Sequence, residues 1–338
     1  MKYIFSLYIA LLLTFIAPHL VRADSVEKVG IHVLNPEEFS EAKRVLFPIA
    51  TTATDDVWHY MTVPLTLGDL EKADRWQQLF SEAKAERVIP IVRLTTRFEN
   101  GSWQRPNRKE LTSLINFLAA LEWPTTEKRI IVFNEVNHAK EWGGVVDPNS
   151  YARDFIFASN WAHAVDENFI VLPAAMDLAA GNTRDTREAF SYLSALSEYD
   201  SEIFSYADAW NSHSYPNPGF SSSPTRTGKN SLRGFETELA FLSQKTDKNF
   251  PVYITETGWR DTRATGRWLT SYYEYALQHI WSKPEVVAVT PFIYKGAPGP
   301  FAEFSFVTAD DQPTNQLLAL QAALENIARG QRLLSSVQ

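Results

Sequence analysis

Eight short apolar runs alternate with amphipathic stretches along the chain after residue 23, and this alternation restricts the fold more than any other feature. Such a series is typical of a parallel sheet whose successive strands are connected by helices. Eight repeats are the number that closes a sheet of this kind into a (β/α)8 barrel. We therefore predict an α/β protein built as one (β/α)8 TIM barrel. The predicted strands are 29–33, 57–63, 88–94, 130–133, 169–172, 207–211, 252–255 and 286–293.

The stretches between these runs carry the signals of amphipathic helices. Asn107 is followed three residues later by Glu110, and an apolar stripe at helical spacing comes next, a combination that marks a capped helix start. Asp147 precedes a proline, which suits the first turn of a helix. We also predict a helix over 73–83 and a final helix over 314–328.

No linker rich in Gly, Ser or Pro divides the chain into two domains. The one segment of that composition, 215–230, falls between the sixth predicted strand and its helix. Such a segment within the barrel pattern is typical of a long functional loop rather than of a domain boundary. We expect one catalytic-sized domain over residues 24–338.

Residues 1–23 have the features of a signal peptide. Lys2 precedes a mostly apolar stretch over 3–17, and a Val-Arg-Ala run ending at Ala23 offers small residues at the cleavage positions. The apolar stretch is shorter than the roughly 20 residues that span a membrane. We therefore expect cleavage and export without a membrane anchor. Periplasm, cell surface and medium all stay open as destinations.

The net charge and the absence of cysteine narrow the possible functions. Without the leader, which contains two basic residues and no acidic one, the chain has 30 basic and 40 acidic residues and a net charge of −10. That balance, with no polybasic run, argues against nucleic acid as a partner. The chain has no cysteine, which excludes thiol nucleophiles, thiolate zinc sites and iron–sulfur clusters. We expect a monomer.

A glutamate follows two of the predicted strands. Glu135 lies in a Phe-Asn-Glu-Val-Asn run that ends the fourth strand, and Glu256 lies in an Ile-Thr-Glu-Thr-Gly-Trp run that ends the seventh. Because the carboxyl ends of barrel strands share one face, we expect these two carboxylates to face each other. Facing carboxyl groups about 5–5.5 Å apart are the working parts of a retaining glycosidase. Asn134 would hold a sugar hydroxyl beside the reacting carbon.

These motifs resemble those of clan A, the (β/α)8 retaining glycoside hydrolases that include cellulases, mannanases, endo-galactanases and β-xylosidases. In that clan an Asn-Glu pair ends strand four and a second Glu ends strand seven. The resemblance implies that Glu135, preceded by Asn134, is the acid/base and that Glu256 is the nucleophile. The His-Ser-Tyr run from His213 is similar to the clan's His-x-Tyr element. It implies that Tyr215 hydrogen-bonds the nucleophile and that His213 lines the subsite. The family within the clan stays open.

The chain departs from the clan's pattern at two places. Many members carry an Arg at the end of strand two, where this chain has a Val-Trp-His-Tyr-Met run over 57–61. The resemblance then implies that Arg93, which ends strand three, serves instead. Many members also have a Trp at the end of strand eight under the reactive sugar. Here the run is Thr-Pro-Phe-Ile-Tyr, so a platform at this place would be Phe292 or Tyr294.

Other side chains near strand ends are candidates for substrate contact. Trp142 and Trp259 lie near the predicted catalytic loops, where sugar stacking and core packing are equally open. We expect His32 and His59 to end strands one and two and to hydrogen-bond sugar hydroxyls. Asp177 is a loop acid for which solvation is favoured over substrate contact.

The histidines show neither His-x-x-x-His nor His-x-His spacing, so we expect no metal and no cofactor.

The sequence thus predicts an exported retaining β-glycoside hydrolase that cleaves a poly- or oligosaccharide by double displacement. A transglycosylase using the same site is an alternative, because a sugar hydroxyl can replace water in the second step. A non-catalytic carbohydrate-binding barrel is a second alternative, which the presence of both Glu135 and Glu256 disfavours. A barrel enzyme of different chemistry is a third, and no Gly-rich phosphate loop supports it. The sugar, the linkage and the choice between internal and terminal cleavage stay open.

Overall fold

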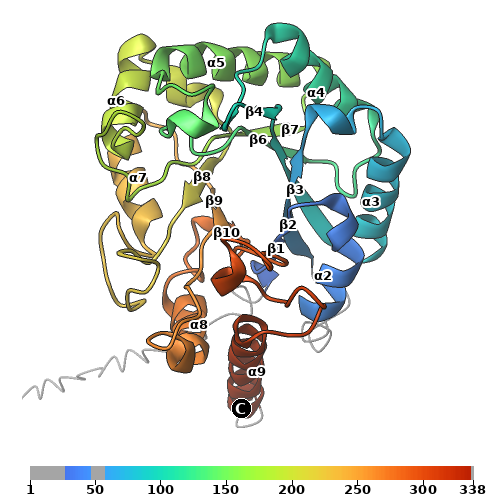
Figure 1. Cartoon of the computed structure of the whole chain (residues 1–338), viewed down its shortest axis with the longest axis vertical. Coiled ribbons are helices and arrows are strands. Elements are labelled where there is room, and N and C mark those ends of the chain that lie inside the picture. Colours follow the sequence, from blue (N-terminus) through green and yellow to red (C-terminus); the bar gives the residue numbers. More distant parts are fainter. Residues whose placement is uncertain (1–26, 47–57, 336–338) are drawn as a thin grey trace, which may run out of the picture.

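In the computed structural model, which describes residues 27–46 and 58–335, a ring of parallel strands is surrounded by helices (Figure 1). The predicted signal peptide lies outside the described residues. The strands of the ring fall on the eight predicted apolar runs, with shifts of a few residues at their ends. They are β1 (Ile31–His32), β2 (His59–Leu65), β3 (Val88–Leu94), β6 (Lys128–Val132), β7 (Phe169–Pro173), β8 (Trp210–His213), β9 (Val252–Glu256) and β10 (Val286–Val289).

The strands pair in chain order and close into a barrel. One sheet has the order β1-β2-β3-β6-β7 and the other has the order β10-β9-β8, with parallel pairing throughout. A parallel bridge between Val29 and Val289 joins the two sheets at one seam. At the other seam the Asp208 amide donates to the carbonyl oxygen of Val171 at 2.9 Å. The carboxyl ends of all these strands therefore lie on one face of the barrel.

Helices follow the strands in sequence and cover the outside of the barrel (Figure 1). The predicted capping pair is present, because Asn107 Oδ1 accepts from the Glu110 amide at 3.0 Å and the Glu110 carboxylate accepts from the Asn107 amide at 2.9 Å. Asp147 likewise caps its helix through the Ser150 amide. The helices are α2 (Phe39–Leu46), α3 (Ala73–Ala85), α4 (Arg108–Ala120), α5 (Pro148–Val165), α6 (Ala189–Tyr199), α7 (Gly234–Leu242), α8 (Leu269–His279) and α9 (Asn315–Ser335).

Short elements occur in several of the loops. A two-stranded hairpin of β4 (Phe98–Glu99) and β5 (Ser102–Trp103) follows β3. The 3-10 helices are η1 (Pro36–Glu38), η3 (Leu67–Asp69), η4 (Ala139–Glu141), η5 (Ile203–Tyr206), η6 (Gly266–Trp268) and η7 (Ala302–Phe304). Residues 215–230 contain no helix or strand and connect β8 to α7, as the composition predicts. Among the described residues, no helix is long and apolar enough to cross a membrane.

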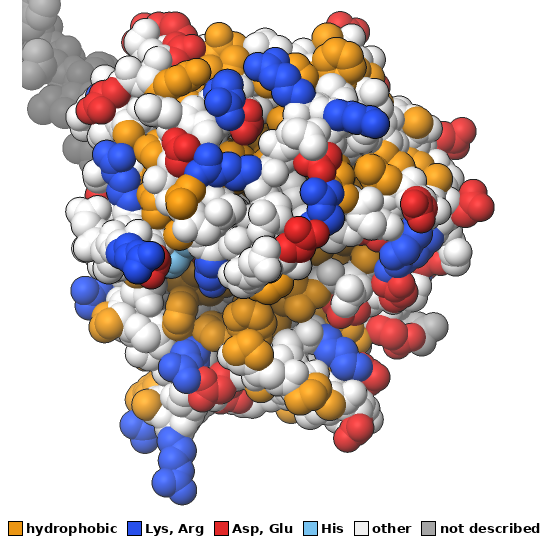
Figure 2. Space-filling view, turned by 45° about the horizontal axis from the view of Figure 1, so that its top comes forward, with side chains coloured by type: hydrophobic (Ala, Val, Ile, Leu, Met, Phe, Trp, Pro, Cys, Tyr) orange, Lys and Arg blue, Asp and Glu red, His pale blue; other side chains and the backbone are white. Residues whose placement is uncertain are grey.

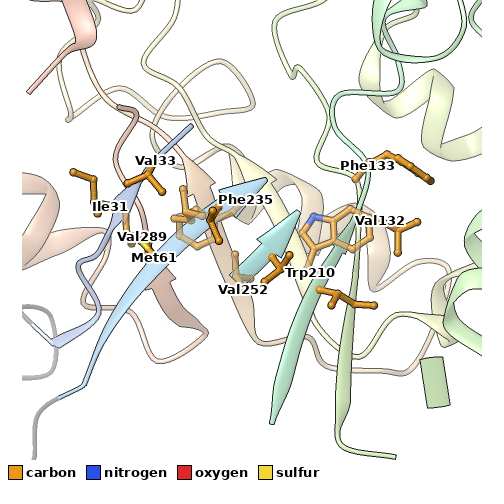
Figure 3. Close-up of a cluster of buried hydrophobic side chains, with 14 of the residues drawn as sticks. Ile31, Val33, Met61, Val132, Phe133, Trp210, Phe235, Val252 and Val289 are labelled. Carbon is orange, nitrogen blue, oxygen red and sulfur yellow. The ribbon is translucent and has the colours of Figure 1, made fainter. Parts of the chain in front are cut away.

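Apolar side chains fill two layers of the protein. The larger cluster lies between strands and helices and includes Met61, Val132, Trp210, Phe235 and Val252 (Figure 3). A smaller cluster fills the barrel interior. Its buried members are Ile91, Ile131, Leu172, Ala209, Tyr253 and Ala288. Because side chains alternate between the two faces of a strand, residues two positions further along also point inward, toward the carboxyl ends of the strands.

Candidate active site

Glu135 and Glu256 lie together at the carboxyl ends of the barrel strands. Glu256 is the last residue of β9, and Glu135 comes three residues after the end of β6. One carboxylate oxygen of each, with one ring nitrogen of His213, form a group whose atoms all lie within 4.8 Å of one another. The two carboxylates that the sequence placed on facing strands are therefore neighbours in space.

The local backbone aims both glutamates at this point. The pairing of β8 with β9 shifts register between Ser212 and His213, so His213 pairs with Glu256. An irregularity of this kind re-aims the side chains that follow it. Phe133 and Glu135 have φ angles of 72° and 30°, in the left-handed region that residues with a Cβ atom rarely adopt. Such strain costs about 1–3 kcal/mol per residue and clusters at active sites.

Glu256 is surrounded by hydrogen-bond donors and positive charge. Arg93 Nη1 donates to its Oε1 at 2.7 Å, and the Tyr215 hydroxyl donates to its Oε2 at 3.2 Å. His213 Nδ1 lies 3.6 Å from Oε2, and His32 Nδ1 lies 3.8 Å from Oε1. The side chain is 10% exposed.

These partners keep Glu256 ionised. Burial alone raises the pKa of a carboxyl group, but the charges of His213, His32 and Arg93 outweigh burial and lower the pKa of Glu256 to about 2. Burial and Arg93 lower the pKa of His32 to about 3, so this ring is neutral near pH 7. Arg93 is therefore the source of positive charge that persists at neutral pH. A carboxylate that is ionised and directed into the site is suited to act as a nucleophile.

Glu135 has fewer partners and more contact with solvent. Its Oε1 accepts from His213 Nδ1 at 2.9 Å, and its side chain is 20% exposed. Among residues 27–46 and 58–335, its other carboxylate oxygen has no hydrogen bond. Burial lowers the pKa of His213, but the nearby Glu256 and Glu135 carboxylates overcome burial and raise it. A partly exposed carboxyl group with a free oxygen is suited to exchange a proton with a bound molecule.

Asn134 links Arg93 to a third carboxyl group that sequence reasoning missed. Arg93 Nη1 donates to Asn134 Oδ1 at 2.9 Å, and Asn134 Nδ2 donates to Glu141 Oε2 at 3.4 Å. Burial and the Glu135 charge raise the pKa of Glu141. The sequence signal that could have identified Glu141 is its position in the loop directly after Glu135, in η4. Asn134 therefore lies within the same hydrogen-bonded group as Glu256.

The two tryptophans proposed for sugar stacking lie in the core, and this reading of the sequence is wrong. Trp142 and Trp259 are fully buried. Trp142 donates from Nε1 to Ser150 Oγ at 2.7 Å, and Trp259 donates from Nε1 to the Ser222 carbonyl at 2.8 Å. Both rings also pack among other aromatic side chains. The Trp142 indole thus connects the loop after β6 to α5, and the Trp259 indole connects the loop after β9 to the loop over 215–230.

His59 and Tyr294 also lie elsewhere than predicted. His59 begins β2 rather than ending it, because the strand continues to Leu65. Its ring contacts the Val29 carbonyl at 3.1 Å, at the opposite end of the barrel from Glu256. Tyr294 is buried, and burial, with the charges of Asp311, Glu41 and Glu38, raises its pKa to about 12. Neither side chain belongs to the group around the paired glutamates.

His32 ends β1 as predicted but is fully buried. Its Nδ1 contacts the Thr255 carbonyl at 3.0 Å, which leaves it beneath Glu256 instead of open to a sugar hydroxyl. Phe292 packs edge-on against it, with ring centroids 5.3 Å apart. Of the two aromatic residues considered for a platform, Phe292 is therefore the one beside the site. Figure 2 shows a hollow on the face it displays, where hydrophobic, basic and histidine side chains meet.

Glu135, His213 and Glu256 are also the group whose geometry could hold a metal ion among the described residues. The chemistry of their surroundings opposes a cation there. Arg93 already places its guanidinium 2.7 Å from Glu256. A histidine must be neutral to bind a metal, whereas the two carboxylates raise the pKa of His213.

Comparison with known proteins supports the fold. No protein-family model matches the chain, and a search of curated proteins gave no match. Among solved structures, the chain is similar to a family 39 glycoside hydrolase from Bacteroides cellulosilyticus, with a TM-score of 0.62 and 16% identity over 89% of this chain. The chain spans 64% of the length of that protein.

Two further solved structures match over almost their whole length. An endo-β-1,4-glucanase from Xanthomonas axonopodis pv. citri has a TM-score of 0.55 and 11% identity, covering 88% of this chain and 99% of that one. A GH128 endo-β-1,3-glucanase from Pseudomonas viridiflava has a TM-score of 0.52 and 14% identity, covering 87% and 97%. The predicted α/β barrel is thus confirmed as the fold, without assignment to a family.

Proposed function

We propose that the protein is an exported retaining β-glycoside hydrolase that cleaves a poly- or oligosaccharide by double displacement. One observation carries the proposal: Glu256 is held ionised within a few ångströms of Glu135 at the carboxyl face of the barrel. Retaining enzymes keep their two carboxyl groups about 5–5.5 Å apart, whereas inverting enzymes need about 6.5–9.5 Å for an intervening water. An oxygen-to-oxygen approach within 4.8 Å supports retention.

In the first step, Glu256 attacks the anomeric carbon while Glu135 protonates the leaving glycosidic oxygen. The C–O bond to the leaving group breaks as the bond to Glu256 forms. In the second step, Glu135 removes a proton from water, which displaces Glu256 and releases the sugar with its original configuration. Glu135 is suited to both steps because one of its carboxylate oxygens is free and the side chain reaches solvent.

The remaining residues hold the nucleophile and the sugar. Arg93 and Tyr215 each donate to one oxygen of Glu256, which fixes the orientation of the carboxylate as well as its charge. Asn134 accepts from Arg93 through Oδ1 and donates one Nδ2 hydrogen to Glu141, so its second Nδ2 hydrogen remains for a sugar hydroxyl near the anomeric carbon. Phe292 packs beside His32 and is 8% exposed, so it offers the sugar ring only a small apolar surface.

Export is part of the proposal and rests on the signal-peptide features of residues 1–23. The resemblance of fold to an endo-β-1,4-glucanase and an endo-β-1,3-glucanase makes β-glucans the first substrates to try. A panel of soluble polysaccharides and aryl glycosides, with product configuration followed by NMR, tests the class. β-Anomeric first products support retention, and α-anomeric products contradict it. Binding without turnover of any glycoside supports the carbohydrate-binding barrel instead.

The roles of the two glutamates are separated by azide. Glu135→Ala keeps the nucleophile, so an activated aryl glycoside should form a glycosyl-enzyme that accumulates without a base to activate water. Azide needs no base and should rescue this variant, giving a β-glycosyl azide. Glu256→Ala should lose several orders of magnitude in turnover, and azide should enter from the vacated face and give the α-azide. Reversed products would exchange the two roles.

A surface acid provides the control for both variants. Glu303 pairs with Arg260, and its side chain is 43% exposed. Glu303→Ala should retain activity and should yield no glycosyl azide beyond that of the unmodified protein. Full activity of either Glu135→Ala or Glu256→Ala on a polysaccharide would remove that residue from the mechanism.

A further inference from the structure

A histidine–aspartate pair lies at the carboxyl face next to Glu135 and has no role in the double displacement. His138 Nε2 and Asp177 Oδ2 are 2.8 Å apart. His138 lies in the loop after β6, and Asp177 lies in the loop after β7. Their side chains are 19% and 30% exposed, so both reach solvent from the face that carries the glutamates.

The pair adjoins both Glu135 and His213 at the carboxyl face of the barrel. The His138 amide donates to the Glu135 carbonyl at 2.8 Å, and the backbone of Asp177 forms a parallel bridge with His213. Strand order places β8 between the loop of Asp177 and the strand of Glu256. The pair therefore adjoins Glu135 directly, whereas the end of β8 separates it from Glu256.

The reaction geometry identifies what would bind there. In a double displacement the nucleophile and the leaving group occupy opposite sides of the anomeric carbon, and the acid stands at the leaving oxygen. Residues that adjoin the acid and are separated from the nucleophile border the leaving group. We propose that His138 and Asp177 form a subsite that binds hydroxyl groups of the leaving-group sugar. This inference rests on the proposed function and specifies that the natural leaving group is a saccharide.

The available atoms of the pair suit sugar hydroxyls. Asp177 Oδ1 accepts from the Ala179 amide at 2.8 Å and Oδ2 faces His138, but each carboxylate oxygen has capacity for a further donor. Among the described residues, His138 Nδ1 has no hydrogen-bond partner. Burial lowers the pKa of His138, but Asp177 and Glu135 overcome burial and raise it. The pair therefore presents a donor beside an acceptor, which matches neighbouring hydroxyls on a sugar ring.

The pair is held in place by a buried amide. Asn137 is fully buried, and its Oδ1 accepts from the Asp177 amide at 3.1 Å. Its Nδ2 donates to the carbonyl oxygens of Asp177 and Arg187, each at 3.0 Å. This network ties the loop after β6 to the loop after β7. A binding group whose supporting residues are fixed loses less entropy when it binds.

The experiment compares two substrates that share one glycone and differ in leaving group. Saccharide and aryl leaving groups are compared in the intact protein and in His138→Ala and Asp177→Asn. Loss of a charge-assisted hydrogen bond should lower kcat/KM for the saccharide by about 10-fold or more relative to the effect on the aryl glycoside. The same variants should lower the yield of transglycosylation to saccharide acceptors. An equal loss on both substrates, or none on either, would overturn the subsite.

A second pair in this chain provides a matched control. His163 Nε2 and Asp208 Oδ2 are 2.9 Å apart, with side chains 37% and 28% exposed, where α5 packs near the start of β8. His163→Ala should leave the ratio of saccharide to aryl activity unchanged. A comparable change in that ratio would mean that the effect of His138→Ala is general to such pairs.

Direct binding separates failure of the subsite from failure of the proposed function. Calorimetry with free oligosaccharides, using Glu256→Ala and the double variant Glu256→Ala/His138→Ala, needs no turnover. Weaker saccharide binding in the double variant supports the subsite even if the intact protein cleaves no glycoside. Equal binding by the two variants overturns it, whatever the activity of the intact protein.

Discussion

Two buried carboxyl groups in this protein, Glu256 and Glu238, have opposite charge behaviour. Glu256 lies at the barrel mouth, and Glu238 lies in α7 against the outside of β8. Burial raises the pKa of Glu238 to about 7, whereas nearby positive charge lowers the pKa of Glu256 to about 2. Burial therefore does not by itself distinguish a catalytic carboxylate from a structural carboxyl group. The charge of the neighbouring side chains distinguishes the two groups.

β8 and the residues that follow it contact both carboxyl groups, Glu256 on the inner face and Glu238 on the outer face. His213 and Tyr215 point into the barrel mouth, and both approach Glu256. Ser212 points to the helix side, where its hydroxyl donates to Glu238 Oε2 at 2.5 Å. Within the described part of the chain, Glu238 Oε1 has no hydrogen-bond partner. A hydroxyl offers one hydrogen bond and no charge, so it cannot compensate for the cost of burying an ionised carboxyl group.

Removal of Arg93 should have the largest effect on this comparison. In Arg93→Met, Glu256 loses the permanent positive charge 2.7 Å from its carboxylate and comes closer to the situation of Glu238. We expect kcat/KM to fall by about 10²–10³-fold, as for other preorganised donors in active sites. The pKa of Glu256 should rise, so the acid limb of the pH profile of kcat/KM should move to higher pH.

Arg93→Lys is the control for charge without the planar donor group. It should retain the position of the acid limb better than Arg93→Met, because an ammonium group preserves the charge but not the shared contact with Asn134. If the acid limb stays in place in Arg93→Met, then Arg93 does not set the charge of Glu256.

The raised pKa of Glu238 should make the free energy of unfolding depend on pH. Its pKa is raised from 4.5 in the unfolded chain to about 7 in the fold, so the folded state holds the proton more tightly. Its contribution to the free energy of unfolding is complete below about pH 4.5 and is lost as pH rises to about 7. The loss corresponds to about 3 kcal/mol. Glu238→Gln has no titrating proton at this position. Its free energy of unfolding should therefore not show this fall between about pH 4.5 and 7.

Denaturant unfolding of both proteins at a series of pH values measures the difference. Glu236 lies two residues away on the same helix, but it pairs with Arg233 and Lys283 at the surface. Glu236→Gln should therefore keep the slope that Glu238→Gln removes. Parallel curves for the unmodified protein and Glu238→Gln would show that folding does not raise the pKa of Glu238.

The sequence predicted the barrel and the residues around Glu256 because both depend on strand periodicity and strand ends. β3 ends one residue after Arg93, which places that side chain at the carboxyl face as expected. The resemblance to clan A implied the Tyr215 contact with the nucleophile, and a hydrogen bond joins the two side chains. Their catalytic roles stay predictions.

The errors concern side chains whose direction depends on tertiary packing. Trp142 and Trp259 lie close to the mouth in sequence, but their rings turn into the core, where indole nitrogens find Ser150 and the Ser222 carbonyl. The predicted second strand, 57–63, begins and ends two residues before β2, in which Pro64 pairs with Arg93. His59 lies near the start of both the predicted run and the observed strand, so its assignment to the carboxyl end is wrong. Local sequence patterns do not show whether such a side chain points into the core or into the barrel mouth.

Tyr215→Phe should have the smallest effect, because it removes one neutral donor from Glu256 and leaves Arg93 in place. The Tyr215 hydroxyl lies 3.2 Å from Oε2, and burial, followed by the charges of Glu256 and Glu135, raises its pKa well above 10. It therefore stays a protonated donor across the working pH range. A hydrogen bond to a charged group contributes about 1.5–3 kcal/mol, or about 10- to 150-fold, and we expect a loss in kcat/KM at the lower end of this range because Arg93 stays in place. The acid limb should move less than in Arg93→Met. A loss equal to that of Arg93→Met would mean that orientation by the hydroxyl, rather than the guanidinium charge, distinguishes Glu256 from Glu238.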